Sequence, residues 1–192
     1  GSQLAEAALP VVAYLADKLK AQVTLLHVIE KNAPASVHGQ RHLTSDEEAC
    51  QYLQQIAEKA FPTAVEVYRH VHTEEVSKVS QSIVQHSDEF DPDLIVMCAH
   101  GEGGLRDFMV GSIAQQVIAS GTIPVLLLKS EKTDTEAFGG FEKILVALDG
   151  NPEHESGYKI AGELAAELGS TIHLVQVVPT LSTLNARQAP TG

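Results

Sequence analysis

Short apolar runs alternate with amphipathic stretches along most of the chain, and this pattern restricts the possible folds more than any other feature. The runs Val23–Ile29, Leu94–Ala99 and Pro124–Leu128 have the length and composition of buried strands. The stretches between them carry apolar residues at helical spacing. Strands that alternate with helices form βαβ units around a parallel sheet. The sequence therefore predicts an α/β protein.

Helices are predicted from apolar spacing and from end signals. Residues 4–19 place apolar side chains on one face, and Pro10 is expected to bend the first turns of that helix. Ser45-x-x-Glu48 is a capping box, so a helix should begin there. Ala64–His70 alternates like a strand. Further helices are expected over Glu74–His86, from about Gly111 to Ser120 and over about residues 154–168, with residues 31–44 as a loop.

The end of the chain repeats its beginning. A shift of 149 residues places Leu25 on Leu174 and Val28 on Val177, without a gap across 30 positions. We interpret the repeat as a duplicated domain, although apolar periodicity alone also produces some such matches. A strand precedes the second copy but not the first. We therefore expect residues 1–129 to form a domain that lacks its first strand, 130–140 to be a linker, and 141–192 to form the first β-α-β part of a second domain.

A sheet that lacks its central strand has two neighbouring strands with unpaired edges. Phe141–Asp149 has the composition to fill that position, either by folding back or by donation from a neighbouring chain. Either route would bring Asp149 to the sheet. The hypothesis requires Ile144–Leu148 to lie between Val23–Ile29 and Leu94–Ala99.

Composition narrows the class of partner. The chain has 13 Lys and Arg residues against 25 Asp and Glu residues, a formal net charge of −12. Nucleic acids and anionic membranes reward clustered basic residues, so neither is an expected partner. Its apolar runs fall short of the roughly 18 residues of a membrane span. The chain has two cysteines and no visible export signal, so we expect the protein to be located in the reducing cytoplasm.

The segment from His100 to Ile113 links the carboxyl end of a predicted strand to the start of a predicted helix. Open α/β sheets bind ligands at this position, and the amides of a helix N-terminus suit phosphate. Gly101 would allow a sharp turn, and Gly111 would let an anion approach the backbone. The spacing matches neither a P-loop nor a dinucleotide fingerprint. An ordinary glycine turn and serine cap remain the alternative.

The spacing of Gly101, nine residues and then Gly111-Ser112 resembles the second part of the Gly-2x-Gly-9x-Gly-Ser/Thr motif of universal stress protein domains. Leu25-Leu-His-Val28 and Ile144-Leu-Val-Ala-Leu-Asp149-Gly150 are also similar to this family. The resemblance implies an open, doubly wound (Rossmann-like) parallel sheet of five strands in the order 3-2-1-4-5. It also implies ATP, with or without Mg²⁺, at the carboxyl ends of strands one and four.

Site residues follow from the same resemblance. Phosphates would lie at the helix start, ribose beside the preceding strand, and adenine near strands one and two. Two positions depart from the family pattern: Cys98 stands where the motif has its first glycine, and the first domain lacks its own strand-one aspartate. The implied contacts are Gly101, Gly111, Ser112 and Ile113 for phosphate, Met97 and Cys98 for ribose, and Val28 (through its backbone) and Asp149 for adenine.

Three functions remain open. The first is an adenine-nucleotide-binding module that acts in a stress response through conformation or assembly. The second is a slow Mg²⁺-dependent ATPase, although no residue pattern names a catalytic base. The third is a nucleotide-free scaffold that dimerises. The resemblance suggests Pro124–Leu128 as the strand that pairs across a dimer or with the second domain. His70-x-His72 and His38-x-x-x-His42 lack the further ligands of a metal site, and we interpret them as solvated histidines.

Overall fold

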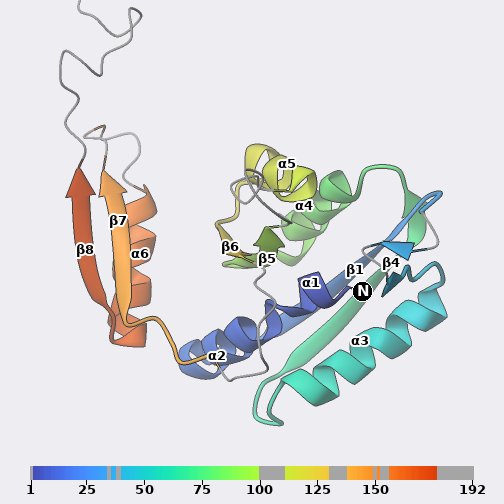
Figure 1. The fold of residues 1–192 in the computed structure, drawn as a ribbon, viewed down its shortest axis with the longest axis horizontal. Coiled ribbons are helices and arrows are strands. Elements are labelled where there is room, and N and C mark those ends of the chain that lie inside the picture. The colour runs from blue at the N-terminus through green and yellow to red at the C-terminus, as the bar shows by residue number, and fades with distance from the viewer. Residues whose placement is uncertain are drawn as a thin grey trace, which may run out of the picture. The chain divides into compact units, whose positions relative to one another are not determined.

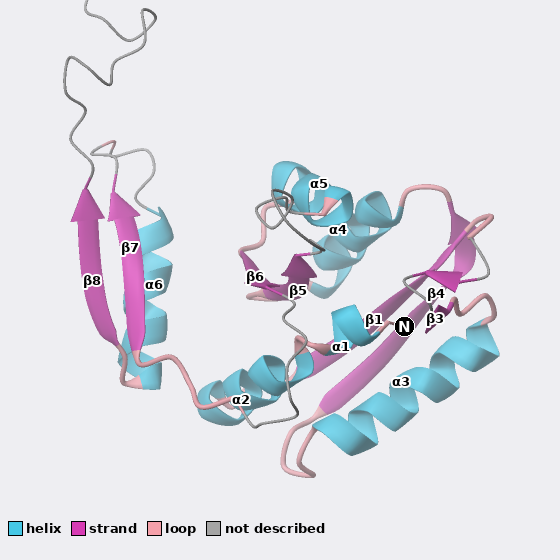
Figure 2. Ribbon diagram, in the orientation of Figure 1, coloured by secondary structure: helices cyan, strands magenta, loops and turns pink. Residues whose placement is uncertain are grey.

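The computed structural model describes residues 2–33, 36–37, 40–99, 111–129, 138–148, 151 and 156–176. The chain divides into two compact units, residues 1–138 and residues 139–192 (Figure 1). In both units helices and strands alternate along the chain, which confirms the α/β prediction (Figure 2).

The first unit contains most of the secondary structure. Its helices are α1 (Gln3–Glu6), α2 (Leu9–Leu19), α3 (Asp46–Ala60), α4 (Val79–Phe90) and α5 (Ser112–Ser120). Its strands are β1 (Val23–Glu30), β2 (Ser36–Val37), β3 (Gln40–Arg41), β4 (Val67–Val76), β5 (Ile95–Ala99) and β6 (Val125–Lys129). The second unit contains β7 (Lys143–Leu148), α6 (Ser156–Leu168) and β8 (Thr171–Gln176).

The described strands form small sheets instead of one five-stranded sheet. Parallel pairs join β1 to β4, β5 to β6 and β7 to β8, and a short antiparallel pair joins β2 to β3. Without its central strand, a sheet of order 3-2-1-4-5 would keep two pairs of strands, 3-2 and 4-5. The observed pairs β4–β1 and β5–β6 correspond to these two pairs. In the described residues, β7 pairs with β8 and with neither β1 nor β5, so the expected folding back of Phe141–Asp149 between these strands is not observed. Donation of Phe141–Asp149 by a neighbouring chain stays a prediction.

The boundary between β4 and α4 corrects the sequence prediction. The sequence predicts that the strand ends at His70 and that the helix begins at Glu74, but β4 continues to Val76 and α4 begins at Val79. The ladder with β1 holds this segment extended, since Val28 pairs with His72 and Glu30 with Val76 across a register shift. Backbone pairing to a neighbouring strand therefore outweighs the local helical spacing. Likewise, the short hairpin β2–β3 lies inside the segment that was expected to be a loop.

Helix ends follow the sequence signals more closely. The Ser45 hydroxyl accepts a hydrogen bond from the Glu48 amide at 3.3 Å, which confirms the predicted cap of α3. The first predicted helix is divided into α1 and α2, with Pro10 in the first turn of α2, as its missing amide proton favours. At Gly121, which ends α5, a Cβ atom would come within 2.9 Å of the Val117 carbonyl oxygen.

Successive side chains of β1 point to opposite faces of the strand, and different helices cover the two faces. Val23 packs with Ala16 of α2 and with Phe61 in a buried cluster, and Leu25 joins the same cluster. The His27 ring, on that same face, lies 6.5 Å from the Tyr52 ring of α3. Leu26 and Val28 point to the other face, where their register partners His70 and His72 meet α4.

Two neighbouring residues of α5 provide a test of this packing. The Val117 side chain is fully buried, whereas Ile118 is 48% exposed. We expect Val117→Ala to lower the free energy of unfolding by about 2–3 kcal/mol, because two methyl groups leave the core and a cavity remains. Ile118→Ala should change it by less than about 1 kcal/mol although it removes more atoms. Urea unfolding followed by circular dichroism measures both, and equal effects would contradict this packing of α5.

Candidate functional site

The predicted phosphate site lies where β5 leads into α5. β5 ends at Ala99, α5 begins at Ser112, and the two elements are in contact. Residues 100–110, which include Gly101, lie outside the described residues, and so does Asp149. The structure therefore bears on six of the predicted site residues: Val28, Met97, Cys98, Gly111, Ser112 and Ile113.

Gly111 is the N-cap residue of α5, with φ −55° and ψ 148°. Any L-amino acid adopts these angles, so the backbone itself does not require glycine here. What the glycine provides is a helix start without a side chain. Its carbonyl oxygen accepts the first helical hydrogen bond, from the Gln115 amide at 3.0 Å. The amides of Ser112, Ile113 and Ala114 precede that bond, and they carry the partial positive charge of the helix start.

The first turn of α5 is open to solvent. Ser112 is exposed and Ile113 is 42% exposed, while Ala114 is buried beneath them. The structure thus brings Gly111, Ser112 and Ile113 together on one accessible turn. Such a turn can bind an anion through backbone amides and one hydroxyl, without a basic side chain.

Cys98 is buried, with 5% of its surface exposed. Burial raises the pKa of its thiol, and a backbone hydrogen bond from Ala8 opposes that shift. The thiol therefore lies against the junction of α1 and α2. Met97, the preceding residue, is half-buried and points to the other face of β5.

Val28 belongs to the pair β1–β4, whereas Met97 and Cys98 belong to the pair β5–β6. Backbone pairing in the described residues does not join these two pairs into one sheet. The predicted adenine and ribose contacts therefore lie on different small sheets of the first unit.

A polar group that sequence reasoning missed lies on the α3 side of β1. The Tyr52 hydroxyl donates to Glu6 Oε1 at 3.0 Å, and burial followed by the Glu6 carboxylate raises the pKa of Tyr52. His27 Nε2 is buried without a hydrogen-bond partner in the described structure. No sequence signal pairs these residues, because they come from separate elements.

Histidines of β4 also differ from their expected role as solvated residues. His70 and His72 are half-buried, and His72 Nδ1 lies 2.9 Å from His86 Nε2 of α4. Among the described residues, no three His, Cys, Asp or Glu side chains are arranged to hold a metal ion.

The family model described as "Universal stress protein family" matches residues 1–129 and 140–191. The chain belongs to the universal stress protein family. Among relatives, it is 26% identical over 144 residues to a universal stress protein of Bacillus subtilis, covering 67% of this chain and 93% of that protein. It is 37% identical over 65 residues to a universal stress protein of Methanocaldococcus jannaschii, covering 33% of this chain and 38% of that protein.

Solved structures of universal stress proteins share the fold. One from Archaeoglobus fulgidus has a TM-score of 0.70 at 19% identity, covering 93% of this chain and 65% of that one. A putative universal stress protein from Pseudomonas aeruginosa has a TM-score of 0.63 at 19% identity, covering 94% of this chain and 59% of that one. This universal stress protein chain thus spans less than two thirds of both.

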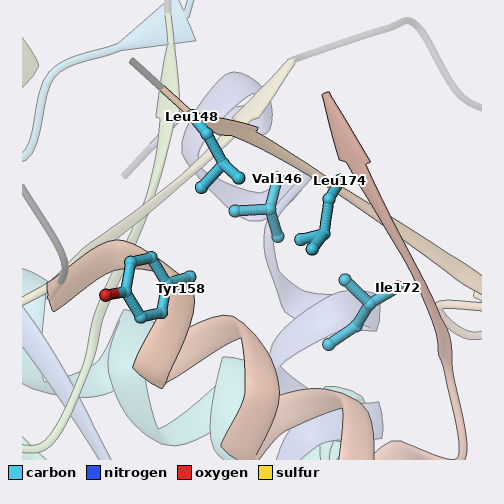
Figure 3. Close-up of a pocket in the computed structure, with 5 residues that line it drawn as sticks. All are labelled: Val146, Leu148, Tyr158, Ile172 and Leu174. Atoms are coloured by element: carbon cyan, nitrogen blue, oxygen red, sulfur yellow. The ribbon is translucent and has the colours of Figure 1, made fainter. Parts of the chain in front are cut away.

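The second unit contains an apolar hollow, and none of the predicted site residues that the structure describes is among its lining residues. Figure 3 shows its lining, which comes from β7, β8 and α6: Val146, Leu148, Tyr158, Ile172 and Leu174. The shift of 149 residues places Ile172 on Val23 and Leu174 on Leu25, which pack in the core of the first unit. We interpret the hollow as the same apolar face with less covering it, since Leu174 is 64% exposed.

Helices in the described part of this universal stress protein are too short or too polar to cross a membrane.

The two cysteines of the chain should react at very different rates. Cys50 is exposed and Cys98 is buried, with the pKa of the Cys98 thiol raised by burial. Because the thiolate is the reactive form, we expect a disulfide reagent at pH 8 to modify Cys50 at least about tenfold faster than Cys98. Mass spectrometry of the digested protein identifies the labelled residue, and Cys50→Ser is the control. Rapid modification of Cys98 in the folded Cys50→Ser variant would contradict its burial.

His27 should make the protein less stable in acid. Burial lowers its pKa from 6.5 to about 4. Between these values the unfolded chain binds more protons than the folded chain, so the free energy of unfolding decreases as pH falls through this window. His27→Gln should remove that part of the decrease, and His173→Gln, which alters an exposed histidine of β8, should not. Urea titrations from pH 7.5 to 4.5 measure both, and identical pH profiles for wild type and His27→Gln would contradict the assignment.

Proposed function

We propose that this chain binds ATP or another adenine nucleotide and acts in a stress response through conformation or assembly. The observation that carries the proposal is the open first turn of α5, where Gly111, Ser112 and Ile113 present amides and a hydroxyl at the end of β5. Membership in the universal stress protein family supports a nucleotide as the anion.

Phosphates are assigned to Gly101, Gly111, Ser112 and Ile113, with the helix dipole of α5 adding to the backbone donors. Ribose is assigned to the segment Met97–Cys98. Adenine is assigned to the backbone of Val28 and to Asp149. The formal charge of −12 does not oppose this assignment, because local amide groups rather than net charge would bind the phosphates.

Completion of the sheet belongs to the same proposal. One strand between β1 and β5 would give the order 3-2-1-4-5 and would join Val28 to Met97 across a single sheet. We assign that position to Phe141–Asp149 donated by a neighbouring copy, which also carries Asp149. The edge of β6 that does not face β5 is the proposed dimer contact, because its residues Val125–Leu128 are apolar and half-buried.

Binding is tested by isothermal titration of ATP into the wild type and into Gly111→Val. A side chain at Gly111 would block approach to the amides, so we expect affinity to fall by about 10–100-fold, the loss of one or two charge-assisted hydrogen bonds. The fold should survive, since φ −55° and ψ 148° suit valine. Circular dichroism and the melting temperature verify this.

Serine substitutions at the two ends of α5 make a matched pair. Both Ser112 and Ser120 are exposed, but only Ser112 lies at the helix start. Ser112→Ala should weaken ATP binding by about tenfold, and Ser120→Ala should leave it unchanged. Equal affinities for all variants would place the nucleotide elsewhere. A folded wild type without saturable binding would favour the nucleotide-free scaffold, and phosphate release above buffer with Mg²⁺ would favour the ATPase.

A further inference from the structure

Three histidines and one glutamate join the strand β4 to the helix α4. His70 and His72 come from β4, and His86 and Glu89 come from the last turns of α4. His86 is 5% exposed, so its ring is enclosed between the two elements. We name these four residues the histidine cluster.

Hydrogen bonds connect three members of the cluster in a chain. His86 Nδ1 lies 2.9 Å from Glu89 Oε2, and His86 Nε2 lies 2.9 Å from His72 Nδ1. The Glu89 carboxylate accepts, so His86 carries its proton on Nδ1. When His86 is neutral, its Nε2 accepts a hydrogen bond from His72 Nδ1–H. When His86 is charged, the direction reverses, and His86 Nε2–H donates a hydrogen bond to His72 Nδ1.

This chain of hydrogen bonds tolerates one added proton but not two. A charged His86 donates to both neighbours, provided that His72 is neutral. If both rings are charged, each nitrogen of the 2.9 Å contact carries a proton, and two donors and two positive charges face each other. The contact between His72 and His86 must then break.

The surroundings offer little compensation for a second charge. The His70 ring lies 4.6 Å from the His86 ring, and burial followed by the charge of His86 lowers the pKa of His70. Phe90 stacks on His86 at 5.5 Å, and the register partners of His70 and His72 on β1 are Leu26 and Val28.

α5 meets α4 through a neutral contact, in which the Ser80 hydroxyl donates to Gln116 at 2.7 Å. Within the cluster, Glu89 is thus the one carboxylate that can offset positive charge on the histidine rings.

We propose that the histidine cluster is an acid-sensitive joint, which holds the end of α4 against β4 until a second proton enters and then releases it. None of its four residues belongs to the proposed nucleotide site, although His72 is the register partner of Val28. The proposed joint predicts local opening of α4 in mild acid, before the rest of the first unit unfolds.

Amide hydrogen exchange of the full chain, read by mass spectrometry and corrected for the intrinsic effect of pH, tests the proposal. Between pH 7 and pH 5, we expect protection of residues 79–90 to fall at least about tenfold more than protection of α3. This comparison separates the joint from His27, whose acid effect should appear at α3 because its ring faces Tyr52.

His72→Gln is the informative variant. An amide can both donate and accept, so the glutamine side chain would satisfy His86 in either protonation state and would add no second charge. We expect this variant to retain protection of α4 at pH 5, whereas His173→Gln on β8 should behave like the wild type. Equal loss of α4 protection in His72→Gln and wild type would overturn the proposal.

A measurement on the wild type keeps the proposal testable if His72→Gln fails to fold. NMR of ¹³C-labelled histidine rings reports the protonation of His72 and His86 together with the backbone signals of α4. The proposal expects native α4 signals to disappear as the second of these rings gains its proton. Two charged rings with native α4 signals would overturn it.

Discussion

The parallel pairing of β1 with β4 is the constraint on which the rest of the first unit depends. It places Val23, Leu25 and His27 toward α2 and α3, and it places Leu26 and Val28, beside His70 and His72, toward α4. Both faces of a parallel sheet must be covered, so each residue of β1 has a neighbour set by the register. A shift of β1 by one residue would exchange the β1 side chains that face α2 and α3 with those that lie beside the histidine cluster.

The residues of the proposed site are divided between two small sheets, because no strand joins β1 to β5 in the described residues. Parallel ladders leave one edge of β1 and one edge of β5 without a strand in the described residues. Backbone amides and carbonyls on such edges favour the addition of a strand. The helix start at Gly111 does not depend on that addition, since α5 is anchored by Ala114 and Val117, which are buried. The proposed phosphate contacts and the proposed adenine contacts therefore have different structural requirements.

Local signals predicted the elements well, and contacts between elements poorly. The cap at Ser45, the end of α5 at Gly121 and the strands around Leu26, Val96 and Leu126 followed from nearby residues. The length of β4 did not, because pairing with β1 determines it. The meeting of His72 with His86 and the contact of Cys98 with Ala8 depend on how elements pack, which local periodicity does not encode. At the candidate site, the turn at Gly111 was predictable from spacing, but its ordinary backbone angles were not.

Because the backbone angles at Gly111 are ordinary, the fold and the binding of an anion place separate demands on this residue, whereas at most glycine-dependent sites the two demands coincide. Where a glycine has positive φ, replacing it strains the fold and removes the function together. At Gly111 a larger residue fits the backbone, so a single codon change can close the helix start to anions while the protein still folds. If the proposed nucleotide binds at this turn, descendants of such a chain can lose it and keep their architecture, and selection on folding alone would not preserve the glycine.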